Sequence, residues 1–145
     1  MKQRTPISQA SDAPDAPTLI CPLFLSRVPA GFPSPAADYE QQPLDLNRHL
    51  VHNPPATFFV RVVGDSMLGA GIHQDDLLIV DRSLEPRDRN VIIAVIYGEM
   101  TVKRIRMRNR GIWLEAENDL YPTRQIAEED DFQVWGVVTH VIHEL

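Results

Sequence analysis

The chain has 145 residues, 43% of them hydrophobic, and a net charge of −6. This length predicts one globular domain with an ordinary core, and the acidic charge argues against a large phosphate-binding surface. A run of about 18 apolar residues, long enough to cross a bilayer, does not occur. The first residues lack the apolar stretch of a secretory signal, and the single cysteine, Cys21, fits a reducing cytoplasm.

Proline dominates the start of the chain, where residues 1–35 hold seven of the twelve prolines. Because proline removes backbone donors and blocks helix formation, this composition predicts an extended or disordered arm. Within the arm, Leu19 to Leu25 (LICPLFL) is a short apolar patch. Such a patch either docks on a surface or is a sticky linker segment, and composition does not separate the two.

The segment from Ser26 to Tyr39 contains Ala30 and Gly31, two small residues flanked by prolines. This is typical of an accessible, extended peptide of the kind that proteases cut. The next segment, Leu44 to Val51, has leucines at helical spacing and predicts a short helix that the following prolines end.

From Thr57 onward the pattern is that of β-strands separated by turns, including Gly98-Glu99 and residues 109–111. The fold class is therefore mainly β and antiparallel, with a half-open barrel or two small sheets, and a βαβ arrangement is not expected. The expected strands are Thr57 to Val63, Asp76 to Val80, Val91 to Tyr97, Met100 to Met107, Ile112 to Ala116 and Phe132 to Ile142.

A candidate nucleophile follows the first of these strands, which stops at Gly64. A strand that ends in a glycine turn presents the next side chains on a sharply bent backbone, and one of these is Ser66. A serine in that position is a nucleophile if a neighbouring group takes its proton. A polar turn without catalytic role is the commoner meaning of a Gly-x-Ser sequence.

The candidate base is Lys103, the only lysine after Lys2 in a chain with twelve arginines. Strand alternation places it on one face with Thr101 and Ile105. The arginines at alternate positions, which begin with Arg104, lie on the other face. Burial on the less charged face lowers a lysine pKa, whereas arginine does not give up its proton. Taken alone, the pattern also fits a lysine that extends to the sheet edge.

Other polar patterns predict no cofactor. The alternating arginines from Arg104 to Arg110 favour a solvated, salt-bridged surface over a nucleic-acid site. Two HxxH pairs, His49 with His52 and His140 with His143, lack a cysteine or carboxylate partner, so no metal is expected. A glycine-rich phosphate loop is absent from the sequence.

Several motifs together resemble the LexA/UmuD self-cleaving serine peptidases. They are GDSM at residues 64–67, DDLLIVD at residues 75–81 and GEMTVKR at residues 98–104. VPAG at residues 28–31 resembles the LexA cleavage loop, and GFPSPAADY at residues 31–39 is similar to the UmuD branch just after its cleavage point. The similarity extends from about Pro22 to the C-terminus, and the arm before it matches nothing recognised.

The resemblance implies a Ser-Lys dyad of Ser66 and Lys103 that cuts the chain's own Ala30-Gly31 bond. Backbone N–H groups of Asp65 and Ser66 would hold the oxyanion. It also implies a division into an arm, residues 1–30, and a peptidase and polymerase-accessory domain, residues 31–145. The UmuD branch has cysteine before the scissile glycine, and this chain has Ala30.

The implied role is that of a homodimeric accessory subunit of an SOS-induced translesion DNA polymerase. Its cleavage would be promoted by a RecA filament on single-stranded DNA, without sequence-specific DNA binding of its own and without a membrane. The alternatives are a LexA-type repressor, a signal peptidase, an α/β-hydrolase and a β-lactamase-like enzyme. Each requires a feature that is not seen in this sequence: respectively a helix-turn-helix, a membrane anchor, Gly-x-Ser-x-Gly and Ser-x-x-Lys. A non-catalytic binding subunit that retains the fold stays open.

Overall fold

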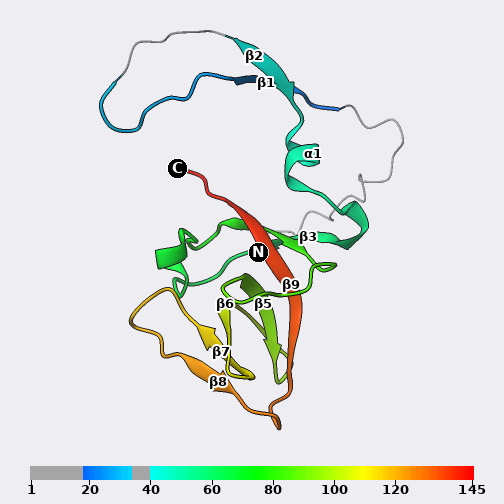
Figure 1. Cartoon of the computed structure of the whole chain (residues 1–145), viewed down its shortest axis with the longest axis vertical. Coiled ribbons are helices and arrows are strands. Elements are labelled where there is room, and N and C mark those ends of the chain that lie inside the picture. The colour runs from blue at the N-terminus through cyan, green and yellow to red at the C-terminus, as the bar shows by residue number, and fades with distance from the viewer. Residues whose placement is uncertain (1–17, 34–39) are drawn as a thin grey trace, which may run out of the picture. The chain divides into compact units, whose positions relative to one another are not determined.

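Seven strands of the computed structural model form one antiparallel sheet in the order β3-β4-β9-β5-β6-β7-β8 (Figure 1). The described residues are 18–33 and 40–145. The strands of this sheet are β3 (Thr57–Arg61), β4 (Leu77–Asp81), β5 (Val91–Ile96), β6 (Glu99–Arg108), β7 (Gly111–Glu115), β8 (Arg124–Ile126) and β9 (Phe132–Ile142). The mainly β, antiparallel prediction is confirmed, and the strands form two sheets, this one and a smaller one of two strands.

The chain divides into two compact units between His49 and Leu50. The first contains a separate two-stranded sheet of β1 (Cys21–Phe24) and β2 (Gln41–Leu44). The short helix α1 (Leu46–Leu50) follows, and the Asp45 carboxylate accepts a hydrogen bond from the Asn47 N–H at its start. Residues 1–17 and 34–39 lie outside the described part, so the predictions for them are not addressed.

Strand β1 was not expected from the sequence, which predicted only an apolar patch in an extended arm. The patch pairs with β2, and Pro22 lies opposite Pro43 in the register. Prolines are tolerated there because each strand of a two-stranded sheet has a free edge. Because each strand contains a proline, neither segment has the composition that is typical of a strand.

Both faces of the larger sheet carry a hydrophobic core, which explains why β5 is an almost unbroken apolar run. Ile92 and Ala94 face one cluster, with Ile105, Leu114 and Val137. Ile93 faces the other cluster, together with Leu78, Val80, Val62, Met67 and Ile72. Burial of β5 on both faces selects β-branched residues at successive positions.

Strand β9 lies inside the sheet, between β4 and β5, and is not at an edge. Its register with both neighbours shifts, once beside Val80 and once beside Ala94, and such bulges bend a strand and increase its twist. Gly136 is required between them, because a Cβ there would lie 2.5 Å from a methyl carbon of Val80.

Two tight turns set the β5-β6-β7 meander. The first has Tyr97 and Gly98 at its centre, one residue earlier than predicted, and both have positive φ. The second has Asn109 and Arg110, also with positive φ, which is typical of turns that match strand twist. Two short 3₁₀ helices, η2 (Pro54–Ala56) and η3 (Leu68–Ala70), complete the described elements. Among the described residues, no helix has the length and apolar character needed to span a membrane.

Candidate active site

The loop after β3 holds Ser66 between a glycine of positive φ and a buried methionine. Gly64 has a φ of +94°, a conformation that favours glycine. Met67 is only 2% exposed and packs in the core with Val62 and Ile72. Because its neighbour is locked in the core, Ser66 stays half-buried at the surface in a defined position.

A second segment, just after β7, braces this loop from the side. The Glu117 N–H donates to the Ser66 carbonyl over 2.9 Å, and the Gly69 N–H donates to the Glu117 carbonyl over 2.7 Å. A Cβ at Gly69 would lie 2.8 Å from that carbonyl oxygen, so the close approach requires glycine. The Glu117 carboxylate forms an ion pair with Arg104 of β6, which ties the brace to the sheet.

The same segment also fixes Asp65 through two hydrogen bonds. The Tyr121 hydroxyl donates to the Asp65 carboxylate at 2.5 Å, and the Asn118 amide donates to the Asp65 carbonyl at 3.0 Å. The hydrogen bond to Asp65 raises the pKa of Tyr121. Asp65 is thus occupied in fixing the turn.

Lys103 reaches the loop from β6. Its Nζ lies 3.1 Å from the Ser66 Oγ, 3.1 Å from the Thr101 Oγ1 and 3.1 Å from the Val102 carbonyl oxygen. All three neighbours are uncharged oxygens, and among the described residues Lys103 forms no ion pair. The two side chains singled out in the sequence are therefore in direct contact, although 37 residues separate them.

The surroundings of Lys103 favour its neutral form. Desolvation by burial lowers the pKa of Lys103 below its ordinary value, because a charged ammonium is poorly solvated there. In the part of the chain that the structure describes, no carboxylate is paired with it to oppose this effect. An amine with a lowered pKa beside a hydroxyl has the arrangement that a general base for serine requires.

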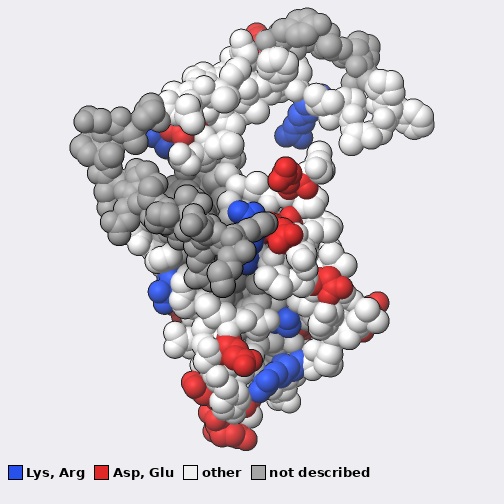
Figure 2. All heavy atoms as spheres, turned by 180° about the vertical axis from the view of Figure 1, so that it is seen from behind, with Lys and Arg blue, Asp and Glu red and all other residues white. Residues whose placement is uncertain are grey.

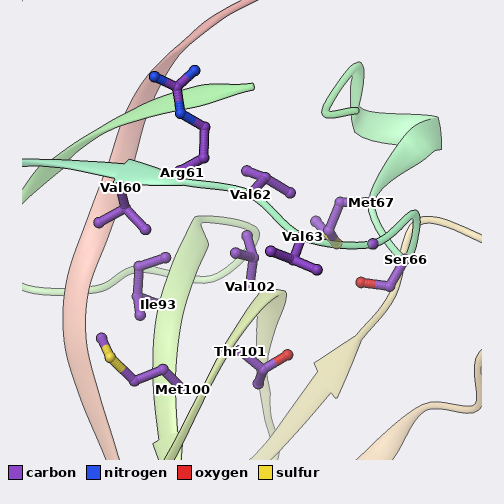
Figure 3. A pocket seen from close by; sticks show the side chains of 11 residues that line it. Val60, Arg61, Val62, Val63, Ser66, Met67, Ile93, Met100, Thr101 and Val102 are labelled. Atoms are coloured by element: carbon purple, nitrogen blue, oxygen red, sulfur yellow. The ribbon is translucent and has the colours of Figure 1, made fainter. Parts of the chain in front are cut away.

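A groove of about 250 Å³ runs along the end of β3 to Ser66 (Figure 3). Ser66 lies at one end, and Val60 and Met100 lie at the other. Most of the remaining lining is aliphatic, including Val62, Val63, Ile93 and Val102. A groove with this lining accepts an extended peptide with small side chains better than a charged ligand.

Two of the three arginines of β6, Arg104 and Arg106, form ion pairs, so the predicted salt-bridged surface is present at these two positions. Arg106 lies 3.1 Å from the Asp88 carboxylate and 3.5 Å from that of Glu115, and its side chain is only 14% exposed. On the face shown in Figure 2, basic and acidic side chains are interspersed without a continuous basic patch. This surface offers no tract for a phosphate backbone.

The predicted cleavage point lies in the other compact unit. Ala30 and Gly31 are exposed, in the connection between β1 and β2. A Cβ at Gly31 would meet no neighbouring atom within 4 Å. The bond is thus accessible, as expected of a peptide that enters another site.

Two groups of residues were missed by the sequence analysis. One is the brace of Glu117, Asn118 and Tyr121, whose turn-like sequence carries no sign of the loop that it contacts. The other is a cluster of His73, Asp76 and His143, in which the Asp76 carboxylate lies 2.6 Å from the His143 Nδ1. The spacing His73-x-x-Asp76 was a usable signal, but His143 was considered with His140, which is not part of this cluster.

Comparison with known proteins gives the family. Residues 22–139 match the model of the Peptidase S24-like family. Protein SamA of Salmonella typhimurium is 48% identical over 85% of each chain. Protein ImpA of Escherichia coli is 49% identical over 84% of this chain and 83% of its own. Protein MucA of Salmonella typhimurium is 43% identical over 85% of this chain and 84% of its own. The chain therefore belongs to the Peptidase S24-like family, with UmuD-like relatives.

Proposed function

We propose that the protein is a serine endopeptidase that cuts its own Ala30-Gly31 bond with Ser66 as nucleophile and Lys103 as base. The observation that carries this proposal is the 3.1 Å contact between the Lys103 Nζ and the Ser66 Oγ. The pKa of Lys103 is lowered by burial, so this amine is more often neutral than an exposed one. Membership of a peptidase family supports the same reaction.

The contacts of Lys103 accommodate the neutral amine as well as the charged ammonium. A neutral amine has two N–H donors and one lone pair. Thr101 and Val102 provide two acceptors, each at 3.1 Å, which leaves the lone pair for the Ser66 hydroxyl. Ser66 Oγ then attacks the Ala30 carbonyl carbon as its proton passes to the Lys103 Nζ. The tetrahedral intermediate expels the Gly31 nitrogen, which takes that proton, and water hydrolyses the acyl-enzyme.

The oxyanion would be held by the backbone N–H groups of Asp65 and Ser66. Within the described part of the chain, neither group donates a hydrogen bond to another residue. Both are therefore available for a substrate oxygen, and the bonds from Asn118 and Tyr121 to Asp65 hold the turn in place. Donors fixed before the reaction stabilise a developing oxyanion without reorganisation.

The Ala30-Gly31 bond suits the aliphatic groove. Small side chains let an extended strand approach Ser66 closely, which a bulky residue would prevent. Gly31→Trp should block cleavage and leave the fold intact, since the position is exposed in the uncut chain. Thermal unfolding should match that of the wild type. Rapid cleavage of Gly31→Trp at the same bond would contradict this assignment.

We further propose that residues 31–145, once released from residues 1–30, form the active accessory subunit of a translesion DNA polymerase. The UmuD-like relatives support this role. A RecA filament on single-stranded DNA would promote cleavage by favouring the docked peptide, and the protein would act as a cytoplasmic homodimer. Static light scattering at micromolar concentration tests the dimer, and a monomer mass would reject it.

The polymerase role is tested in cells. Ser66→Ala should abolish damage-induced mutagenesis, and a chain that begins at Gly31 should restore it in the Ser66→Ala background. This rescue by the shortened chain separates loss of cleavage from loss of fold. Full mutagenesis with Ser66→Ala alone would refute the claim that cleavage activates the protein.

The alternative is a non-catalytic regulatory subunit that retains the peptidase fold. Incubating the purified protein at pH 9–10 separates the two hypotheses, because only a peptidase shortens itself. The aliphatic groove would then bind a partner's peptide without cutting it. The lowered pKa of Lys103 favours the catalytic hypothesis, since a binding groove has no need of a desolvated amine.

A further inference from the structure

The cluster of His73, Asp76 and His143 lies outside the candidate active site and is assembled by the sheet. Leu77, the first residue of β4, pairs with Ile142, the last residue of β9. The antiparallel register therefore sets Asp76 opposite His143. His73 lies in the turn before β4, where the Asp76 N–H donates to the His73 carbonyl over 3.1 Å.

The three side chains converge on one point. One ligand atom from each lies within 4.8 Å of the other two. The Asp76 carboxylate lies 2.6 Å from the His143 Nδ1 through one oxygen and 3.6 Å from the His73 Nδ1 through the other. The two imidazole rings are close, with centroids 4.5 Å apart.

The carboxylate is buried and fixed by the backbone, whereas both imidazole rings are partly exposed. The Asp76 side chain is 3% exposed, and its Oδ2 accepts a hydrogen bond of 2.7 Å from the His73 N–H. The side chains of His73 and His143 are 48% and 39% exposed. A ligating carboxylate is commonly held by such a hydrogen bond, while exposed rings can rotate without disturbing the core.

We propose that His73, Asp76 and His143 bind a divalent transition-metal ion of the zinc type. Two imidazole nitrogens and one carboxylate oxygen are the donors that Zn²⁺ takes, leaving a fourth position for water. Tetrahedral donors about 2.1 Å from Zn²⁺ lie about 3.4 Å apart, within the range that the cluster already spans. Ca²⁺ and Mg²⁺ are not expected, because they require mostly oxygen ligands.

The ion would join the end of β9 to the turn before β4. That turn forms two backbone hydrogen bonds with Val62, which lines the groove near Ser66. The Val62 N–H donates to the Asp76 carbonyl and the Asp75 N–H donates to the Val62 carbonyl, each over 2.9 Å. Bound metal would therefore stabilise one wall of the groove. A ligand that binds only the folded state also raises the melting temperature.

The test is a titration of the chelator-treated full chain with ZnCl₂ by calorimetry and with CoCl₂ by visible absorption. One equivalent should bind, and the cobalt spectrum should be that of a four-coordinate site. His73→Ala and His143→Ala should each weaken binding at least about tenfold, the smallest loss usual for perturbing a metal site. His140→Ala is the matched control, since this exposed residue of β9 is outside the cluster, and it should bind as the wild type does.

A positive control guards against a folding defect in the alanine variants. His143→Cys supplies a thiolate at the same position, so it should retain binding and add sulfur-to-cobalt charge-transfer absorption. The proposal is overturned if wild type binds neither ion, or if both alanine variants bind with unchanged affinity. It is equally overturned if His140→Ala weakens binding as much as they do, or if His143→Cys shows no thiolate band.

Discussion

Replacement of Lys103 by arginine tests the proposed base, because it keeps the positive charge and removes the ability to lose a proton. An unperturbed lysine has a pKa of about 10.4, so about one in 2,500 is neutral at pH 7. Burial lowers the pKa of Lys103, and its three oxygen neighbours carry no charge to oppose this. Self-cleavage should thus accelerate about tenfold per pH unit above neutrality and level off below about pH 10.4.

The size of the arginine effect follows from the two pKa values. At pH 9 about one unperturbed lysine in 25 is neutral, against fewer than about one arginine in 3,000. The lowered pKa of Lys103 makes this difference larger. Lys103→Arg should therefore slow cleavage at least about 100-fold at pH 9.

The assay is the loss of full-length protein, followed by intact mass from pH 6 to 10 without any partner. Lys2→Arg, at the only other lysine, is the matched control and should cleave as the wild type does. A wild-type rate that is flat over this range would count against lysine as the base. So would a Lys103→Arg rate comparable to that of the wild type.

Three further outcomes are expected. Lys103→Met should raise the melting temperature at pH 7, by about 2–4 °C for each kcal/mol gained. Because the pKa of Lys103 is lowered on folding, the folded protein carries a penalty below that pKa, and the gain should fade between the lowered pKa and the unfolded value of about 10.4. Gly136→Ala should destabilise by about 1–3 kcal/mol in urea unfolding, because its Cβ would overlap a valine of β4. Tyr121→Phe should slow cleavage several-fold without moving the midpoint of the pH profile, since it frees Asp65. Tyr97→Phe, which loses a similar bond to an aspartate elsewhere, should leave the rate unchanged.

The strands with two buried faces were predictable from local sequence. Val91 to Tyr97 is a run of β-branched residues, and β5 differs from it by one residue at its end. The side of β6 that carries Lys103 also followed from strand alternation. In these cases burial acts on consecutive residues, so the pattern is visible within one segment.

The features that sequence reasoning missed depend on contacts between distant segments. Strand β1 exists because it pairs with β2, whose own sequence has weak strand propensity. The brace at Glu117 and Tyr121 is defined by hydrogen bonds to a loop about 50 residues away, and the spacing of turn residues does not encode them. The position of β9 inside the sheet was missed because strand order is a property of the whole topology.

The central claim is that Ser66 cuts the chain's own Ala30-Gly31 bond. The most direct measurement is intact mass with N-terminal sequencing, on wild type and Ser66→Ala incubated side by side at pH 9–10. Wild type should yield a product that begins at Gly31, and Ser66→Ala should keep its full mass. A product that begins elsewhere, or the same product from Ser66→Ala, would contradict the account.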